Sequence, residues 1–328
     1  MLATAWPRSG EAVSRLGFGA MGFAGWFGDQ PERAHVAALH RALDLGVNVI
    51  DTARAYGDSE RIVGLALREW RGAKPFLATK IERLGRRRGW AMPIPAEEAF
   101  PKGHVSRSAE ESLRALGVDQ VDLMQLHIWW PTWGIAGYWM DELQALKESG
   151  KARFVGVSIP DHRSDMALSI VASGLIDSVQ TIVNIFDPLA LENLAPACAA
   201  NRVALIARCI LDEGGLTGFL TPETRFAPDD YRAGYFDEVI PRAAYMAKVD
   251  ALRKFVPEHA GSLAALALKF VVHDPAVTTA LSSMHVTAHA EANVAALAGP
   301  PLSDAVFDDL FAHHRFIKNL NYAGEAEW

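Results

Sequence analysis

Residues 47–57 read VNVIDTARAYG, and this stretch guides the interpretation of the whole chain. It opens as a short apolar run typical of a buried strand, and Asp51 and Tyr56 follow where that strand should end. Two further runs end in the same way, since PFLAT precedes Lys80 and VDLMQL precedes His127. Polar residues with useful chemistry therefore recur at the carboxyl ends of predicted strands.

The rest of the chain repeats one unit, a strand-like run followed by an amphipathic helical stretch. Strands that are separated by helices pair in parallel, and eight such units in 328 residues predict a closed α/β architecture, a (β/α)8 TIM barrel. No linker or low-complexity tract divides the chain, so residues 1–328 are expected to form a single domain, with 1–15 as a plug or hairpin beneath the barrel. The strand-like runs are residues 15–21, 47–51, 75–81, 121–127, 152–158, 178–186, 203–209 and 276–282.

A parallel barrel brings the carboxyl ends of its strands to one mouth, where enzymes of this architecture place their catalytic groups. Asp51, Tyr56, Lys80 and His127 should therefore converge there, although each taken singly could be an ordinary cap, surface group or hydrogen-bonding residue. Together they supply a carboxylate, a phenol, an ammonium and an imidazole. This set suits protonation of a carbonyl oxygen while another group delivers hydride.

Composition and charge exclude several classes of function. The chain is 50% hydrophobic with a net charge of -7, which argues against a nucleic acid or an anionic membrane as partner. No apolar run is long enough to cross a bilayer and no signal peptide is evident, so a cytoplasmic protein is expected. Two cysteines, Cys198 and Cys209, are too few for a disulfide framework or a cysteine zinc site, and no metal site is predicted. Nothing in the sequence indicates an oligomeric state.

Gly17, Gly19 and Gly22 spell the G-x-G-x-x-G pattern of dinucleotide-binding folds in an unsuitable context. That pattern requires the third glycine to open a helix, whereas the loop-like FAGWFGDQP follows Gly22. We therefore predict no Rossmann domain and expect these glycines to let the backbone approach a ligand. Long loops on the catalytic face are expected at residues 82–103, 128–138 and 212–238.

Four motifs give the chain a resemblance to the aldo-keto reductase superfamily. They are GVNVIDTARAYG at 46–57, ATK at 78–80, SLRALGVDQVDLMQLH at 112–127 and GKARFVGVS at 150–158. The resemblance extends from LGFGAMG at 16–22 to EANVAAL at 291–297. It implies an oxidoreductase that interconverts an alcohol and a small-molecule carbonyl, either an aldehyde or ketone or a sugar-like compound. It also implies a nicotinamide cofactor bound without a Rossmann domain.

The same resemblance implies Tyr56 as the general acid or base, with Asp51, Lys80 and His127 around it. An unperturbed tyrosine has a pKa of about 10, and a nearby ammonium favours the phenolate. We therefore expect Lys80 to lower the pKa of Tyr56 and Asp51 to keep Lys80 charged. His127 is expected to hydrogen-bond the carbonyl oxygen of the substrate.

A cofactor site along the later strands is also implied by the resemblance. Ser158 and Gln180 would hold the nicotinamide carboxamide, and Asn293 would contact adenine. The loop LDEGGLTG at 211–218 would wrap the pyrophosphate through its backbone N–H groups. The residues expected to contact the cofactor are Gly19, Met21, Asp51, Ser158, Gln180, Arg208, Leu211, Gly215, Ser283, His285 and Asn293.

Two positions depart from the family pattern. Arg208 stands where the family commonly has an aromatic residue that stacks on nicotinamide. Its guanidinium could stack there or contact substrate, or it could turn away to pair with a carboxylate. After the last strand, Ser282 and Ser283 replace a Pro-Gly pair, and no Lys or Arg follows through Asn293, which leaves His285 as the candidate for the 2′-phosphate. NADP(H) is favoured over NAD(H) on the family pattern, and these residues weaken that preference.

The substrate pocket is expected to draw on aromatic residues of the loops. Trp26, Phe27, Trp129 and Trp130 would wall it, and plain packing of the loop is the alternative for Trp130 and for the nearby Trp133. The basic run Arg86–Arg88 is either a solvated loop or a contact for an anionic substrate or cofactor phosphate.

Two other functions compete with that of a reductase. A cofactor-binding regulatory protein with little turnover, like the potassium-channel beta subunits of this superfamily, is compatible with the same motifs. A metal-dependent barrel hydrolase would need several His and Asp ligands at strand ends, and His127 is the only histidine that ends a predicted strand.

Overall fold

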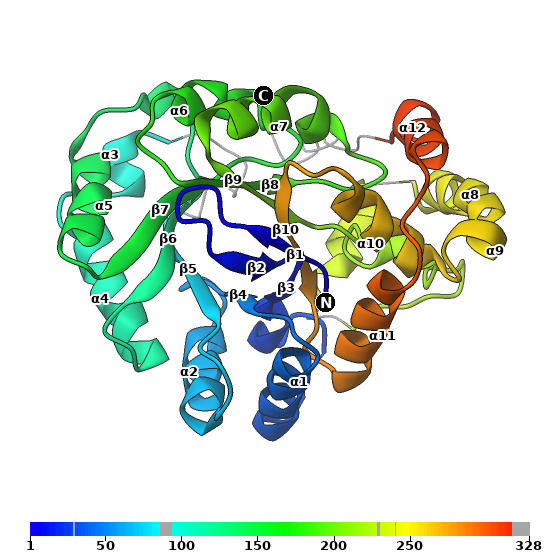
Figure 1. Cartoon of the computed structure of the whole chain (residues 1–328), viewed down its shortest axis with the longest axis horizontal. Helices are drawn as coiled ribbons and strands as arrows, with labels where there is room; N and C mark the ends of the chain where they lie inside the picture. The colour runs from blue at the N-terminus through cyan, green and yellow to red at the C-terminus, as the bar shows by residue number, and fades with distance from the viewer. Residues whose placement is uncertain (29, 86–93, 228–229, 240, 317–328) are drawn as a thin grey trace.

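A computed structural model describes residues 1–316 of the chain apart from 29, 86–93, 228–229 and 240. Eight parallel strands form a closed barrel in the order β10-β3-β4-β5-β6-β7-β8-β9, which confirms the predicted architecture (Figure 1). The barrel strands are β3 (Leu16–Gly19), β4 (Val49–Asp51), β5 (Phe76–Glu82), β6 (Val121–His127), β7 (Ala152–Ser158), β8 (Ser178–Ile182), β9 (Ala204–Arg208) and β10 (Val277–Ser283).

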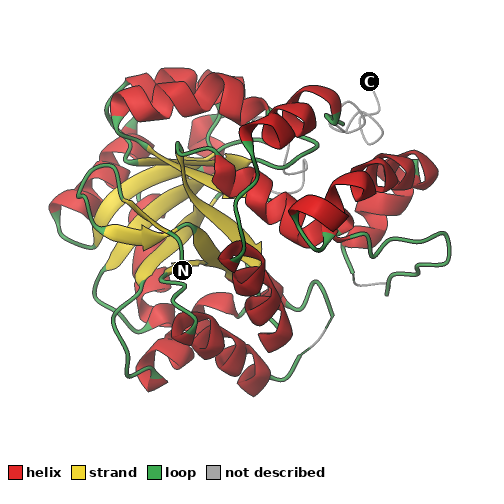
Figure 2. Ribbon diagram, turned by 45° about the vertical axis from the view of Figure 1, so that its right-hand side comes forward, coloured by secondary structure: helices red, strands yellow, loops and turns green. Residues whose placement is uncertain are grey.

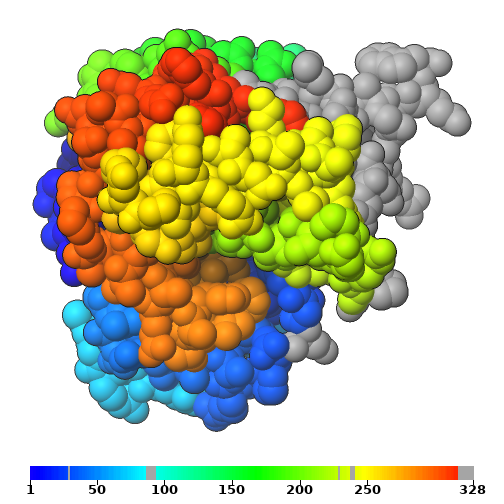
Figure 3. Space-filling view, turned by 90° about the vertical axis from the view of Figure 1, so that its right-hand side faces the viewer, coloured from blue at the N-terminus to red at the C-terminus, as the bar shows by residue number. Residues whose placement is uncertain are grey.

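Helices cover the outside of the barrel, because the strands carry an apolar face outward as well as inward (Figure 2). Helix α11 lies beside α1, so the ring of helices closes where the barrel closes (Figure 3). The helices are α1 (Glu32–Asp44), α2 (Ser59–Glu69), α3 (Ala96–Ala99), α4 (His104–Leu116), α5 (Tyr138–Glu148), α6 (Leu168–Ala172), α7 (Leu189–Asn201), α8 (Arg242–Leu252), α9 (Val256–His259), α10 (Leu263–His273), α11 (Thr287–Ala298) and α12 (Asp304–His313).

An N-terminal hairpin closes the amino end of the barrel, as the sequence predicts. Its strands are β1 (Ala3–Ala5) and β2 (Ala12–Ser14), which pair antiparallel. Trp6 between them is fully buried and packs its ring 4.5 Å from Phe76 and 5.5 Å from Phe154, both inside the barrel. The hairpin therefore seals the amino end and leaves the carboxyl end as the accessible mouth.

The segment after β3 confirms that the glycine pattern is not a dinucleotide fingerprint. A 3-10 helix (Ala20–Ala24) follows β3, and α1 begins only at Glu32. A Cβ added at Gly22 would lie 2.5 Å from the imidazole of His285, and one added at Gly19 would lie 3.3 Å from the carbonyl of Ser282. These glycines let the end of the first strand and the turn after it pack closely against the last strand and His285, and the expected approach of a ligand stays a prediction.

The three long segments follow β5, β6 and β9, on the carboxyl side of the barrel. Residues 82–103 contain α3, residues 128–138 contain the 3-10 turn Pro131–Trp133, and residues 212–238 lead into a π-helical segment (Gly234–Val239). Arg86–Arg88 lie outside the described residues, so the expectation for them stays open.

Among the described residues, no single helix has the length and apolar composition of a membrane span. A sufficient length and apolar composition is found only when two helical segments that meet at a bend of 82° are taken together, Arg242–His259 and Leu263–His273.

Candidate active site

The alternation of side chains along parallel strands decides which residues face the mouth. Along β5, Phe76 and Ala78 lie in the interior cluster with Trp6, so Lys80 faces inward two residues later. The same period of two applies on the other strands. It turns inward a ring of polar residues near the mouth, namely Asp51 on β4, Lys80 on β5, Gln125 and His127 on β6, Ser158 on β7, Gln180 on β8 and Arg208 on β9.

Lys80 is the centre of the polar cluster at the mouth. It is fully buried, and its Nζ donates to Oδ1 of Asp51 and, at 2.9 Å, to the carbonyl of Thr52. It also hydrogen-bonds the hydroxyl of Tyr56, with Nζ 5.0 Å from the centre of that ring. Burial alone would lower the pKa of Lys80, but Asp51 and Tyr56 outweigh it and raise that pKa above its usual range. Lys80 is therefore charged at neutral pH.

The second oxygen of Asp51 is held by two glutamines. Gln180 Nε2 donates to Oδ2 at 3.0 Å and Gln125 Nε2 donates to it at 3.3 Å. Gln125 is fully buried and was missed by the sequence analysis, although its inward register two residues before His127 could have revealed it. With Lys80, these contacts satisfy a buried carboxylate that would otherwise be costly.

Tyr56 lies next to Lys80 with its ring surrounded by aromatic neighbours. It meets the rings of His127 at 5.4 Å and Trp26 at 6.0 Å, both edge to face. Burial raises the pKa of Tyr56 and outweighs the lowering by Lys80, so the net direction is upward. Lys80 lowers the pKa of Tyr56 as expected, but desolvation of the phenolate exceeds the attraction of the ammonium, an effect that the sequence analysis did not anticipate. Arg208 also lowers this pKa, which means that its charge reaches the mouth.

His127 completes the group of four residues expected at the mouth. It is 7% exposed, and its ring faces that of Tyr56. The structure thus brings together side chains from Asp51 to His127, which are far apart in the chain.

Ser158 and Gln180 lie in register with each other on neighbouring strands. Both are nearly fully buried, at 3% and 1% exposure. A hydroxyl beside an amide oxygen offers a donor and acceptors of the kind that a primary carboxamide requires. The pair therefore fits the group that the sequence analysis assigned to it.

Arg208 turns toward a carboxylate, which is the pairing alternative left open above. Its Nη2 donates to Asp161 Oδ1 at 2.6 Å and to the carbonyl of Ile159 at 3.0 Å. The side chain is 20% exposed and that of Asp161 is 29% exposed. Asp161 was not identified from the sequence, because it lies in a loop whose path no periodic pattern specifies.

The loop 211–218 does not direct most of its N–H groups toward a ligand, which corrects the expectation for it. The backbone N–H groups of Asp212, Gly214, Gly215, Leu216, Thr217 and Gly218 donate to carbonyls between Cys209 and Gly215. These tight turns require left-handed backbone at Asp212, Glu213 and Gly214, with φ of 50°, 55° and 89°. Leu211 is half-buried and Gly215 is buried.

The same loop is anchored from the next elements of the chain. The hydroxyls of Tyr235 and Tyr245 both donate to the carboxylate of Asp212, at 2.9 and 2.6 Å. Neither tyrosine was recognised in the sequence. Burial and the nearby Asp212 raise the pKa of both phenols well above the usual range, so they stay neutral donors.

The end of β10 holds its polar residues in contacts within the protein. Asn293 Nδ2 donates to Ser282 Oγ at 2.9 Å, and Ser283 Oγ lies 2.9 Å from His285 Nδ1. Burial, with smaller contributions from His289, His35 and Arg232, lowers the pKa of His285 to about 4. His285 is therefore neutral at pH 7 in the protein without a bound ligand, so it would act as a cation for the 2′-phosphate only if the phosphate raised its pKa.

Arg232 is a cation near this strand end that the sequence analysis missed. Its charge acts on His285, and its guanidinium lies 5.3 Å from the ring centre of Phe27. It is paired with Asp230 at 2.6 Å. Its position depends on the fold of the long loop after β9, so no local signal marks it.

The aromatic residues expected to wall a substrate pocket divide into two groups. Trp26 and Phe27 are half-buried, as is Met21 in the same segment. Trp26 lies near Tyr56, and Phe27 stacks on His285 with ring centres 5.7 Å apart. Trp129 is fully buried and Trp130 is 8% exposed, and both belong to the hydrophobic core. Trp129 therefore has no exposed surface for a pocket wall, because its loop folds back onto the barrel.

Within the part of the chain that the structure describes, no group of three or more His, Cys, Asp or Glu side chains is arranged to hold a metal ion.

Comparisons with known proteins agree with this geometry. Residues 15–315 match the model of the Aldo/keto reductase family. The chain is 30% identical over 283 residues to the aldo-keto reductase YhdN of Bacillus subtilis (strain 168), which covers 83% of this chain and 82% of that protein. It is 28% identical over 310 residues to an NADH-specific methylglyoxal reductase of Escherichia coli (strain K12), covering 89% and 92% of the two chains.

A solved structure supports the same relationship. The glycerol dehydrogenase AKR11B4 from Gluconobacter oxydans superimposes with a TM-score of 0.76 at 28% identity, and the match covers 96% of each chain.

Proposed function

Because the chain belongs to the Aldo/keto reductase family, whose members are oxidoreductases of carbonyl and alcohol groups with nicotinamide cofactors, we propose that it reduces a small-molecule carbonyl with Tyr56 as the proton donor. One observation carries this proposal. The fully buried ammonium of Lys80 bonds at once to the carboxylate of Asp51 and to the hydroxyl of Tyr56, in an inward-facing position at the mouth.

The side chains at the mouth divide the work of protonating a carbonyl oxygen. Tyr56 gives its proton to the oxygen, and Lys80 stabilises the phenolate that forms, since the ammonium already bonds the phenol oxygen. Asp51, held by Gln125 and Gln180, keeps Lys80 charged and fixed. His127, which faces the Tyr56 ring, orients the substrate oxygen by a hydrogen bond.

The electrostatics of Tyr56 do not by themselves choose between reduction and oxidation. Burial raises its pKa above the usual range, so the phenol keeps its proton at neutral pH. That is the form that carbonyl reduction requires, and Lys80 opposes the rise in pKa by stabilising the phenolate that proton transfer leaves behind.

A nicotinamide cofactor would supply the hydride. Ser158 and Gln180 would hold its carboxamide, and Met21, Leu211 and Gly215 lie on segments that border the same mouth.

We expect NADP(H) to be used, with weak discrimination against NADH. Strong discrimination normally needs an Arg or Lys on the 2′-phosphate. The segment from Ser282 to Asn293 contains neither residue, and His285 is neutral at pH 7. Arg232 is the cation near His285 that could take this contact.

The substrate should be a compound that packs against the half-buried Trp26 and Phe27. The C–H face of a sugar-like carbonyl compound or the plane of a flat ketone would suit these rings. Trp26 is the more informative of the two for the substrate, because its ring packs edge to face against that of Tyr56.

A screen of sugars, keto-acids and aromatic aldehydes tests this function, with oxidation of NADPH and NADH followed by absorbance. We expect reduction of at least one class with both cofactors. Tight binding of nucleotide without turnover of any class would contradict the proposal and favour a cofactor-binding regulatory protein.

A further inference from the structure

Arg208 occupies an inward-facing position at the carboxyl end of β9. Ala204 and Ile206 on the same strand lie inside the barrel, so the period of two turns Arg208 toward the mouth. Its neighbour across the sheet is Ile182, at the end of β8. A charged side chain in this position lies among the groups of the proposed nicotinamide site.

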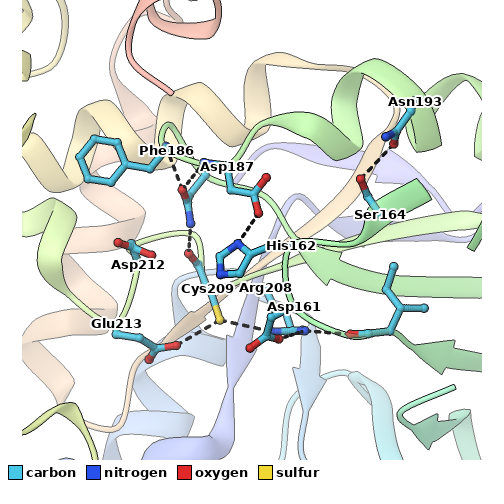
Figure 4. A network of polar contacts seen from close by, with 12 residues as sticks. Asp161, His162, Ser164, Phe186, Asp187, Asn193, Arg208, Cys209, Asp212 and Glu213 are labelled. Carbon is cyan, nitrogen blue, oxygen red and sulfur yellow. Dashed lines mark hydrogen bonds and ion pairs between the residues drawn. The ribbon is translucent and has the colours of Figure 1, made fainter. Parts of the chain in front are cut away.

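The guanidinium reaches across the end of a strand. Strand β8 lies between β7 and β9, and Arg208 on β9 bonds to Ile159 and Asp161 in the loop after β7. Figure 4 shows Arg208 turned toward Asp161. Because β8 lies between β7 and β9, this pair spans the carboxyl end of β8, the strand that carries Gln180.

The backbone around the pair is held in an uncommon conformation. His162, directly after Asp161, has φ of 58°, and Cys209, directly after Arg208, has φ of 52°. His162 Nδ1 lies 2.6 Å from the carboxylate of Asp187, and the Sγ of Cys209 donates to Glu213 at 3.2 Å (Figure 4). Left-handed backbone at such residues is costly and tends to persist at functional sites. Both members of the pair are thus fixed by their neighbours in the chain.

The charge of this pair matters because the two forms of nicotinamide differ in charge. The oxidised ring is a cation, and the reduced ring is neutral. An isolated guanidinium at the mouth would disfavour the oxidised ring. The positive charge of Arg208 acts on Tyr56, and the carboxylate of Asp161 at 2.6 Å offsets part of the charge that the guanidinium would otherwise present there.

We propose that Asp161 and Arg208 act as a neutral ion pair beside the nicotinamide, which sets the relative affinity for oxidised and reduced cofactor. Asp161 offsets the repulsion that Arg208 would otherwise exert on the oxidised ring. This inference rests on the proposed function, because it assumes that nicotinamide lies at this mouth.

Cofactor binding, measured without turnover, tests the pair. Dissociation constants for NADP⁺ and NADPH are measured by titration calorimetry on wild type, Asp161→Asn, Arg208→Gln and the double variant. We expect Asp161→Asn to raise the ratio of the oxidised to the reduced constant by roughly tenfold, and Arg208→Gln to lower it by a similar factor. The double variant should return the ratio close to that of wild type.

Glu69→Gln is the matched control, since it removes a carboxylate from the exposed Arg33–Glu69 pair between α1 and α2. It should leave the ratio unchanged.

Three results would contradict the inference in distinguishable ways. Equal weakening of both cofactor forms in both single variants would mean that the pair only supports the loops. A ratio within about twofold of wild type in both would mean that nicotinamide lies beyond the reach of these charges. No binding of either cofactor by wild type would overturn the proposed function itself.

Discussion

The two sides of the barrel mouth differ in where their polar side chains find partners. On the side of β4, β5 and β6, Asp51 and Lys80 bond to each other and to Tyr56, all within the group of residues that the proposed reaction uses. On the side of β9 and β10, the polar groups are engaged elsewhere. Arg208 bonds to Asp161 in a loop, and His285 is buried, neutral and in contact with Ser283.

This difference reflects two sources of structure. On the first side, Asp51 and Lys80 are inward-facing residues of adjacent strands that register brings together, and Tyr56 follows in the short loop after β4. The second side depends on loops after β7 and β9, whose course brings Asp161 and Arg232 to the strand ends. In the proposed function, the first side would hold the proton-transfer groups in place, and the second side would set the charge that a cofactor meets.

Loss of the Tyr56 hydroxyl should have the largest effect. Tyr56→Phe should lower turnover by roughly 10²–10⁴-fold, because general acid catalysis typically contributes that much. Cofactor affinity should stay near that of wild type, as measured by titration. Tyr138→Phe at the start of α5 is the control and should be active. A rate close to wild type for Tyr56→Phe would remove the phenol from the mechanism.

Loss of the Lys80 ammonium should lower both the stability of the protein and its rate of turnover. Lys80→Met leaves the carboxylate of Asp51 buried without its cation, which should cost about 3–5 kcal/mol in the free energy of unfolding. Urea denaturation measures this. Lys151→Met breaks the exposed pair with Glu110 and should cost less than about 1 kcal/mol. If Lys80→Met and Lys151→Met were equally stable, the buried Asp51–Lys80 pair would contribute no more to stability than an exposed ion pair does.

His285 should make stability depend on pH on the second side. Its pKa is about 4 in the fold and about 6.5 when unperturbed, so the unfolded chain binds more protons between these values. The stability that His285 contributes is present above about pH 6.5 and is lost as pH falls toward about 4, by up to roughly 3 kcal/mol.

Thermal unfolding of wild type and His285→Phe across this window checks the assignment. The variant should lose less stability than wild type on acidification, and NADPH affinity of wild type should be constant between about pH 6 and 8. NADPH affinity that falls as pH rises through 7 would mean that His285 binds the phosphate as a cation after all.

The smallest effect is expected where Tyr235 and Tyr245 hold the loop 211–218 through Asp212. Tyr235→Phe removes one of the two phenols that donate to Asp212, which should cost about 1–2 kcal/mol. Hydrogen exchange should then speed up at residues 211–218 while β9 stays protected. Unchanged exchange would mean that Tyr245 alone holds the loop.

The fold and the strand-borne polar residues at the mouth could be predicted because both follow periodic patterns, whereas the role of Tyr56, in the loop after β4, was implied by the family resemblance. Apolar runs and strand ends predicted the barrel, and inward register placed Lys80 beside Asp51. The pKa direction of Tyr56 could not be obtained this way, because it depends on how completely the surrounding side chains exclude water. The partners of Arg208 and the burial of Trp129 also depend on loop paths, which tertiary packing decides.

The most direct test of the account is a titration of Tyr56 itself. Protein labelled with ¹³C at the tyrosine Cζ is titrated by NMR in wild type and in Lys80→Met, and the Tyr56 signal is assigned by its absence in Tyr56→Phe. We predict a pKa above about 10 in wild type and a still higher one in Lys80→Met, since burial raises it and the ammonium opposes that rise. A Tyr56 pKa that is the same in both proteins, or that lies below about 10 in wild type, would contradict the account.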